Sequence, residues 1–424
     1  MSGDPPRDDR PAYVGSDMSH IGGSPTPLAV TIGVPHTEVG VAYLALLNRL
    51  PTDRERADAA ERGLVATCRE LARSDEHLAR LERHLPGGFV LAGSDAALNA
   101  HPVGTFSDDD VVVVGANGQL LLHGGNNSYI PQFQGEFPLS STWLDDWRAV
   151  VAQAQERATA AGVPLVQIIV PEKVAAQPSA YPFELSIRGP RPIELLLAGC
   201  PTIDYPLDRF QASAEPAFLA TDSHLSPAAG QMMIADICDR LGLAPIDTTG
   251  DAGECLYLGD LGYRLDPGVI EACVFPAQAP TVSITDQNLI EMIAAGVHLG
   301  SYRITDNPAA PYAKRVLVFG DSFSLPPPPG VLGSFGDLLT RTFKTVHFCW
   351  APFCWDEAIV AETQPDLIIQ EGGERGIHRV PALDVDFVSL AAAALAPQAH
   401  PGASSPAHAL PARDRRARFW RRRS

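Results

Sequence analysis

The pattern of hydrophobic and polar positions changes along this 424-residue chain. Residues 1–33 show no apolar periodicity and are rich in Pro, Gly, Ser and Asp, which predicts a disordered leader. Over residues 36–90 leucines recur at helical spacing, which predicts a small module of three helices. Its expected core consists of Leu44, Leu47, Leu71, Leu78 and Leu81. Residues 396–424 return to Ala, Pro and Ser and end in arginines, which predicts a disordered basic tail.

Residues 105–395 carry short apolar runs that alternate with amphipathic stretches, the pattern of a sheet with crossover helices. Helices are expected from Thr142 to Gly162 and from Ser226 to Gly242, since each ends at a glycine and the second opens on Ser-Pro. Continuously apolar runs favour a buried, mostly parallel sheet, so we predict an α/β domain. Strands are expected at 111–114, 119–122, 164–170, 315–319, 345–348 and 366–370.

Composition and charge narrow the functional classes. Hydrophobic residues make up 45% of the chain and charged residues 19%, enough for a sizeable core. The net charge is −18, and the last 14 residues hold seven Arg and one Asp, so the rest carries −24. An acidic body argues against nucleic-acid binding. The arginines beside Phe419 and Trp420 are either a solvated tail or a contact with an anionic membrane surface.

The sequence lacks the patterns of a membrane span, a signal peptide, a disulfide framework and a metal site. There is no apolar run of 18 residues and no signal-peptide pattern at the start, so the chain as written is expected to be cytoplasmic. The seven cysteines lack the spacing of a disulfide framework, and the histidines form no metal-ligand cluster. We therefore expect core cysteines and no metal site.

Three residues can support nucleophilic catalysis. A serine hydroxyl needs a neighbouring base and a third group that orients the base. Ser322 directly follows the strand at 315–319, where open α/β sheets place their sites, and Gly320 allows a sharp turn. Asp222 and His224 lie two apart before a helix, so both can face one nucleophile. We predict Ser322 as nucleophile, His224 as base and Asp222 as its orienter; the alternatives are an ordinary turn and a helix cap.

Further residues could stabilise charge near this triad. The backbone N–H groups of Ser322 and Phe323, with the side-chain amide of Asn126 or Asn127, are candidate donors to an oxyanion. Arg375, beside Glu374, either binds a substrate carboxylate or belongs to a structural ion pair.

Six elements in chain order resemble the alginate O-acetyltransferase family, the AlgX and AlgJ type. They are Val114-Gly115-Ala116-Asn117-Gly118-Gln119-Leu120, Ile169-Val170-Pro171-Glu172-Lys173, Thr221-Asp222-Ser223-His224-Leu225-Ser226-Pro227, Gly259-Asp260-Leu261, Val318-Phe319-Gly320-Asp321-Ser322-Phe323-Ser324, and Pro365-Asp366-Leu367 with Glu374-Arg375. The chain departs from the family at Leu225, where the family has Trp beside the histidine. It also departs at 326–329, where four prolines delay the helix expected after the nucleophile.

The resemblance implies an SGNH-hydrolase-like three-layer sandwich whose motif order is circularly permuted, because Asp-x-His precedes the serine. It implies acetyl transfer to a hydroxyl of a polysaccharide, in alginate or other exopolysaccharide biosynthesis, through an acyl-enzyme on Ser322 and without a cofactor. The implied partners are a glycan acceptor and a membrane-bound O-acyltransferase that supplies acetyl groups, and family members usually act outside the cytoplasm. A carbohydrate acetylesterase or deacetylase, or a non-catalytic glycan-binding protein, remains an alternative reading.

Overall fold

The computed structural model describes Arg54 and residues 87–395. The gaps in this range lie at 126–127, 248–251, 277–281, 287, 290–291, 293–296 and 327–332. The sequence predictions for 1–33, for 396–424 and for most of the module at 36–90 lie outside the described residues. The last residues of that module begin the strand β1 (Phe89–Leu91).

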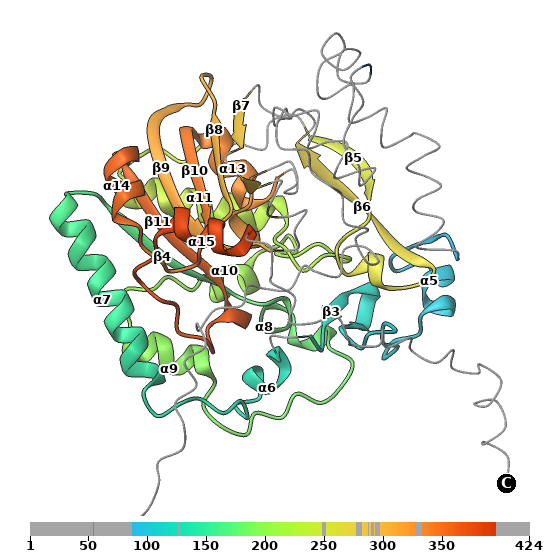
Figure 1. Cartoon of the computed structure of the whole chain (residues 1–424). Helices are drawn as coiled ribbons and strands as arrows, with labels where there is room; N and C mark the ends of the chain where they lie inside the picture. Colours follow the sequence, from blue (N-terminus) through green and yellow to red (C-terminus); the bar gives the residue numbers. More distant parts are fainter. Residues whose placement is uncertain are drawn as a thin grey trace, which may run out of the picture.

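The described chain is a mixed α/β structure around a six-stranded sheet (Figure 1). The strand order is β4-β11-β9-β10-β8-β7. The first four are parallel neighbours, whereas β8 runs antiparallel to both β10 and β7, so the prediction of a mostly parallel sheet agrees with the structure. The strand bounds are β4 (Leu165–Val170), β7 (Ser283–Asp286), β8 (Tyr302–Asp306), β9 (Tyr312–Gly320), β10 (Phe343–Trp350) and β11 (Leu367–Gly373).

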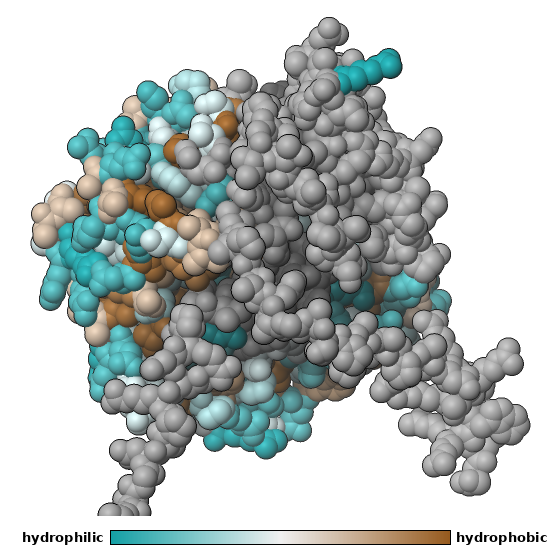
Figure 2. Space-filling view, viewed as in Figure 1, coloured by the Kyte–Doolittle hydropathy of each residue, from teal (hydrophilic) through white to brown (hydrophobic). Residues whose placement is uncertain are grey.

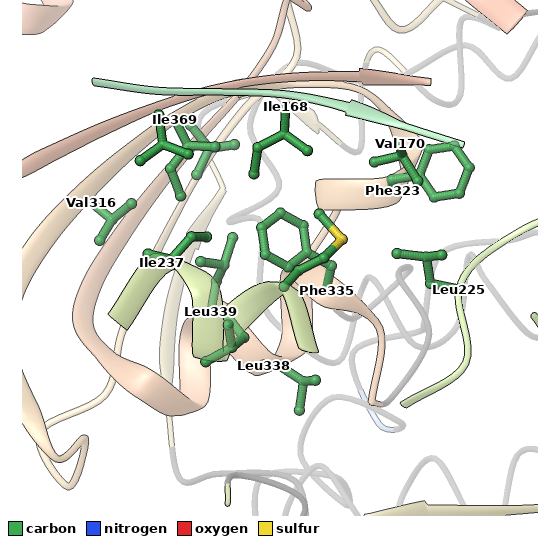
Figure 3. Close-up of a cluster of buried hydrophobic side chains, with 14 of the residues drawn as sticks. Ile168, Val170, Leu225, Ile237, Val316, Phe323, Phe335, Leu338, Leu339 and Ile369 are labelled. Atoms are coloured by element: carbon green, nitrogen blue, oxygen red, sulfur yellow. The ribbon is translucent and has the colours of Figure 1, made fainter. Parts of the chain in front are cut away.

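Alternate residues of the central strands face two different cores, because successive side chains of a strand point to opposite faces. Val316 and Val318 of β9 face the core that α11 and α13 cover (Figure 3). Leu317 and Phe319 face the other core, which α7, α9, α14 and α15 cover. The helix bounds are α7 (Trp143–Ala161), α9 (Pro192–Gly199), α11 (Pro227–Arg240), α13 (Phe335–Thr342), α14 (Glu357–Thr363) and α15 (Phe387–Leu395).

Local signals set the ends of the two helices that the sequence predicts. Ser226 precedes α11, and its hydroxyl accepts a hydrogen bond from the N–H of Ala229 at 3.3 Å. Pro227 is the first residue of α11, where a missing N–H costs nothing. The helix α7 stops before Gly162, whose φ of 68° is a conformation that favours glycine. Both helix predictions are therefore confirmed.

Smaller elements lie beside the large sheet. The strand β6 (Gly268–Pro276) lies between β1 and β5 (Ala252–Tyr257) in a three-stranded sheet. The strands predicted at 111–114 and 119–122 are confirmed as the antiparallel pair β2 (Val112–Val114) and β3 (Leu120–Leu122). The short helices are α5 (Asp95–Ala100), η1 (Ala116–Gly118), α6 (Tyr129–Phe133), α8 (Lys173–Ala176), η2 (Pro178–Ala180), α10 (Leu207–Ala212), η3 (Gly262–Arg264), η4 (Ser322–Ser324) and η5 (Glu374–Gly376).

The surface mixes polar and apolar side chains over the described part of the face in Figure 2. Val388 of α15 is the most exposed of the large apolar side chains that the structure describes, at 79%. Among the described helices, none has both the length and the apolar character that a membrane crossing requires.

Candidate functional site

The turn that carries Ser322 follows β9 and is held by two carboxyl groups. The Asp321 side chain accepts hydrogen bonds from the N–H of Phe323 at 3.0 Å and from the N–H of Gly373, at the end of β11, at 2.8 Å. The Glu371 side chain accepts from the N–H of Asp321 at 3.2 Å and from the Ser324 hydroxyl at 2.5 Å. The turn is thereby fastened to the neighbouring strand β11.

Gly320 lies close to two polar side chains at this turn. A β-carbon at this position would lie 2.8 Å from Oε2 of Glu371 and 2.9 Å from the Ser324 hydroxyl. The sequence predicts that Gly320 allows a sharp turn. The structure instead shows it as the last residue of β9, without a positive φ, under the Glu371 carboxyl group. Burial, followed by the proximity of Asp321, raises the pKa of Glu371 well above its usual value.

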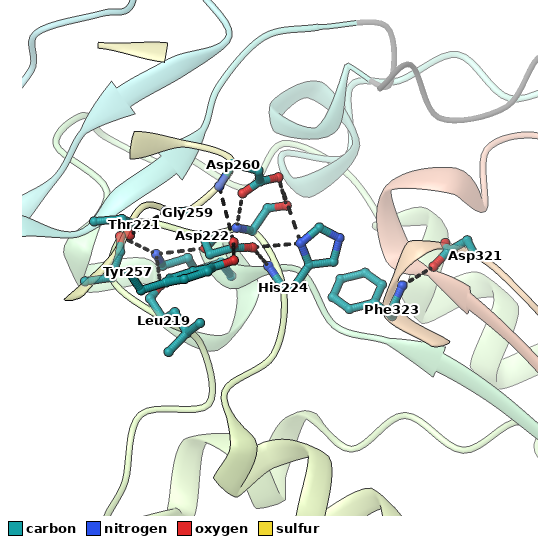
Figure 4. Close-up of polar contacts among 12 residues, drawn as sticks. Leu219, Thr221, Asp222, His224, Tyr257, Gly259, Asp260, Asp321 and Phe323 are labelled. Carbon is teal, nitrogen blue, oxygen red and sulfur yellow. Dashed lines mark hydrogen bonds and ion pairs between the residues drawn. The ribbon is translucent and has the colours of Figure 1, made fainter. Parts of the chain in front are cut away.

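Asp222 and His224, which lie two positions apart on the loop before α11, contact each other. His224 donates through Nδ1 to Oδ1 of Asp222 at 2.7 Å, and its backbone N–H donates to the same oxygen at 2.8 Å (Figure 4). The Asp222 side chain is 2% exposed and the His224 side chain 14% exposed. The geometry therefore assigns the proton on Nδ1, which leaves Nε2 as the acceptor of the neutral ring.

Residues from several elements hold this loop in place. Glu271 of β6 accepts from the N–H groups of Ala220 and Thr221 at 2.8 Å and 2.7 Å. Lys173 is the first residue of α8, three positions after the end of β4. It donates to the carbonyls of Leu219 and Ala220 at 2.6 Å and 2.8 Å. The same ammonium group lies 3.3 Å from the carbonyl oxygen of Asp222. The small sheet and the end of β4 thus fix the position of Asp222 and His224 together.

Electrostatics favour the charged form of the pair. Burial by itself would lower the pKa of His224, but the Asp222 carboxylate, helped by Asp260, outweighs burial and raises the pKa to about 9. Burial would raise the pKa of Asp222, but the charge and hydrogen bonds of His224 and the hydroxyl of Tyr257 lower it well below its usual range. At neutral pH the imidazolium–carboxylate form therefore dominates.

Phe323 links the two halves of the site. Its ring meets the His224 ring edge-on with the centroids 5.4 Å apart, and the Arg375 guanidinium lies over it at 5.3 Å. In Figure 4 the side of the His224 ring away from Asp222 faces Phe323. Leu225 is instead buried in the core that α11 covers. The aromatic side chain beside the histidine therefore comes from the residue after Ser322.

The structure brings some candidate residues together and not others. Ser322 is half-buried, and within the described part of the chain its hydroxyl makes no hydrogen bond to His224. The N–H of Phe323 is already donated to Asp321, so in this structure it is not free for an oxyanion, a correction to the role expected of it. Asn126 and Asn127 lie outside the described residues.

Arg375 and Glu374 do not pair with each other. Nε of Arg375 lies 3.2 Å from Oε1 of Glu172. Burial raises the pKa of Glu172 to about 7, although the positive charge of Arg375 acts to lower it. Glu374 accepts from Arg191 at 2.7 Å and from the Tyr205 hydroxyl at 2.8 Å. Both side chains thus belong to buried ion pairs, which is one of the two alternatives that the sequence left open for Arg375.

Sequence reasoning missed Tyr257 and Glu371. Tyr257 donates its hydroxyl to Asp222 across 35 positions of sequence, and no spacing rule reports such a contact. Glu371 did carry a signal, since it is a carboxyl residue directly after the strand predicted at 366–370, at the strand end where open α/β sheets place their sites.

Asp222, His224 and Asp260 place one potential ligand atom each within 4.8 Å of the others. Hydrogen bonds nevertheless occupy both carboxylates and Nδ1 of the histidine. Both Asp222 oxygens accept hydrogen bonds, His224 is bonded through Nδ1, and Asp260 accepts from the N–H and hydroxyl of Ser223 at 2.7 Å and 2.6 Å. A cation would have to displace these bonds, so we assign the acidic groups to hydrogen bonding.

A groove of about 720 Å³ lies elsewhere on the molecule. It is lined by the first residues of β4, the end of α7 and the segment at 201–204, with Arg240 at its side. Ser322 and Lys173 follow the opposite, carboxyl ends of the parallel strands. The groove therefore does not belong to the candidate site.

Comparisons with known proteins give distant likenesses. No protein-family model matches the chain, and no curated protein matches it. Bacillus cereus PatB1 with a sulfonyl adduct aligns at 12% identity with a TM-score of 0.40, over 66% of this chain and 98% of that one. The O-acetyltransferase domain of Pseudomonas putida AlgJ aligns at 17% identity and 0.37, over 67% and 98%. Pseudomonas aeruginosa AlgX aligns at 14% identity and 0.37, over 74% and 70%. At these TM-scores the likenesses carry no argument about function.

Proposed function

We propose that this protein is a serine-dependent O-acetyltransferase that acts on a hydroxyl group of a glycan. One observation carries the proposal: His224 is bonded through Nδ1 to Asp222 at 2.7 Å, and its ring packs on Phe323, the neighbour of Ser322. A base and its orienter thereby lie against the turn of a serine that follows a buried parallel strand. The acetyl group and the glycan come from the sequence resemblance.

The reaction begins at Ser322. Its hydroxyl oxygen attacks the carbonyl carbon of an acetyl donor, and the proton passes to Nε2 of neutral His224. Asp222 stabilises the imidazolium that results, because its carboxylate already accepts the Nδ1 proton. Collapse of the tetrahedral intermediate breaks the bond to the leaving group, which takes the proton from Nε2. The product is an acetyl ester on Ser322.

The second half of the reaction regenerates the serine. The glycan hydroxyl attacks the acetyl carbonyl while His224 takes its proton, and the bond to the Ser322 oxygen breaks as that oxygen takes the proton back. The N–H of Ser322 and the side chain of Asn127 are the proposed oxyanion donors. In this proposal the domain is SGNH-hydrolase-like with a permuted motif order, and a membrane-bound O-acyltransferase supplies the acetyl group.

The test has a covalent and a catalytic arm. Phenylmethanesulfonyl fluoride should add one sulfonyl group to the intact protein, and peptide mass spectrometry should place it on Ser322. Turnover of p-nitrophenyl acetate with and without oligosaccharides should be lost in Ser322→Ala and His224→Ala. The control Ser389→Ala removes an exposed hydroxyl that donates to Asp386, far from Ser322 in the sequence, so it should behave like the parent protein.

The outcomes separate the rival functions. Acetylated oligosaccharide, detected by mass spectrometry, supports transfer. Acetate release that oligosaccharide does not divert indicates an esterase or deacetylase. If the parent protein, Ser322→Ala and His224→Ala all show the same background and no sulfonyl adduct forms, the enzymatic proposal is wrong.

A further inference from the structure

The Asp222 carboxylate is held on both of its oxygens. Oδ1 accepts the two hydrogen bonds from His224, through the ring and the backbone. Oδ2 accepts the Tyr257 hydroxyl proton at 2.5 Å and the N–H of Asp260 at 3.2 Å. A carboxylate offers about four lone-pair directions, so these four donors leave it no freedom to rotate.

Tyr257 is placed by the three-stranded sheet. It is the last residue of β5, and its ring packs against Leu219 and Cys273 of a small buried cluster. Gly259, two residues on, donates its N–H to the Thr221 hydroxyl at 3.2 Å, so the segment after β5 follows the Asp222 loop closely. The hydroxyl of Tyr257 is therefore aimed at Asp222 by the fold, and Figure 4 shows it beside that carboxylate.

We propose that Tyr257 is a positioning residue for the Asp222–His224 pair. Its hydroxyl fixes the plane of the Asp222 carboxylate. Oδ1 of Asp222 therefore stays in place to accept the hydrogen bond from Nδ1 of His224, and the His224 ring stays in contact with Phe323. The effect of Tyr257 on turnover rests on the proposed function. Its effect on the hydrogen bond between Asp222 and His224 does not.

The groups around the pair do not duplicate this contact. Asp260 lies 3.9 Å from Nδ1 of His224 but spends its oxygens on Ser223. Lys173 binds backbone carbonyls, and Arg375 pairs with Glu172. Within the described residues, Tyr257 is the only side chain besides His224 that donates to the Asp222 carboxylate. Removing its hydroxyl leaves Oδ2 with one longer hydrogen bond, and the carboxylate gains freedom to turn.

The test compares Tyr257→Phe with Tyr302→Phe. Both remove one hydroxyl from a largely buried ring, but Tyr302 bonds to His347, away from the site. Proton NMR at low temperature should show the Nδ1 proton of His224 as a sharp downfield signal, assigned by its absence in His224→Ala. We expect Tyr257→Phe to broaden or abolish this signal and to lower kcat about tenfold with little change in KM, the effect of losing a hydrogen bond to a charged group. Tyr302→Phe should change neither.

A packing control separates the hydroxyl from the ring. Cys273→Ala thins the packing around Tyr257 but keeps its hydroxyl, so the proposal expects the downfield signal to persist. The proposal is overturned if Tyr257→Phe keeps a sharp signal, or if Cys273→Ala abolishes the signal as fully as Tyr257→Phe does. The NMR comparison is repeated in the Ser322→Ala background, because the signal does not depend on turnover. Loss of the signal in Tyr257→Phe without any measurable turnover in the parent would count against the proposed function alone, whereas a signal that persists in Tyr257→Phe would count against this inference.

Discussion

The ring of Phe323 meets the ring of His224 edge-on at 5.4 Å between centroids, so the residue after the proposed nucleophile touches the proposed base. Phe323 is 2% exposed and also lies under the Arg375 guanidinium. One side chain thereby couples the turn after β9 to the loop before α11. The relative position of serine and histidine depends on this contact.

Phe323→Leu should clearly lower kcat while it lowers the free energy of unfolding only modestly. Leucine keeps an apolar side chain but leaves the His224 ring without its aromatic neighbour, so we expect roughly a tenfold loss of kcat and about 1 kcal/mol of unfolding free energy. Phe348→Leu is the matched control, because Phe348 is buried in the same core on β10. Equal kcat losses in both variants, measured beside denaturant unfolding, would show that general core packing is responsible.

Turnover should rise with pH toward about 9. His224 must be neutral to accept a proton. Burial lowers its pKa, but the charge and hydrogen bond of Asp222 together outweigh burial and raise the pKa to about 9, so the neutral base becomes available only as the pH increases. Asp260→Asn removes a negative charge 3.9 Å from Nδ1, which should lower that pKa and move the rising limb to lower pH. Profiles of kcat/KM between pH 6 and 10 test both expectations. A rising limb that Asp260→Asn leaves in place contradicts the assigned electrostatics.

Lys173→Met should destabilise the Asp222 loop. The ammonium group donates to two carbonyls within 2.8 Å. Methionine would remove both bonds; the Ala220 oxygen keeps the N–H of Leu120 at 2.8 Å, but the buried Leu219 oxygen loses its lysine donor. We expect a loss of about 2 kcal/mol in the free energy of unfolding, the usual cost of an unsatisfied buried acceptor. Lys173→Arg, which keeps the donors, should lose less. Urea denaturation of the three proteins decides, and equal stability of Lys173→Met and the parent would refute the tethering role.

Gly320→Ala should strain the nucleophile turn. Its added β-carbon would meet the Glu371 carboxyl at 2.8 Å, so either the strand end or the carboxyl has to move. We expect about 2 kcal/mol of destabilisation and slower sulfonyl addition at Ser322. Gly376→Ala is the control, since nothing lies within 4 Å of a β-carbon there. Thermal unfolding and adduct formation measure the two effects, and indistinguishable variants would rule out this steric role for Gly320.

Residue patterns alone determined where four strands of the central sheet and two of the helices lie. Continuous apolar runs located β4, β9, β10 and β11 to within a few positions, because strands that are buried on both faces need apolar residues at successive positions. Caps and glycines located α7 and α11, because helix ends must satisfy their own backbone groups. Spacing also located Asp222 and His224 on one loop, since side chains two apart can share a side.

Tertiary structure alone decided how these residues are supported. Tyr257 reaches Asp222 from the end of β5, and Glu371 reaches the Ser322 turn from β11, over separations of 35 and 50 positions. Such contacts depend on how the small sheet and the parallel strands pack against each other. The periodicity of apolar residues indicates single helices and strands, but it does not indicate which elements come into contact. For the same reason the aromatic neighbour of His224 is Phe323 and not residue 225: the site is assembled from two loops that approach each other only in the folded chain.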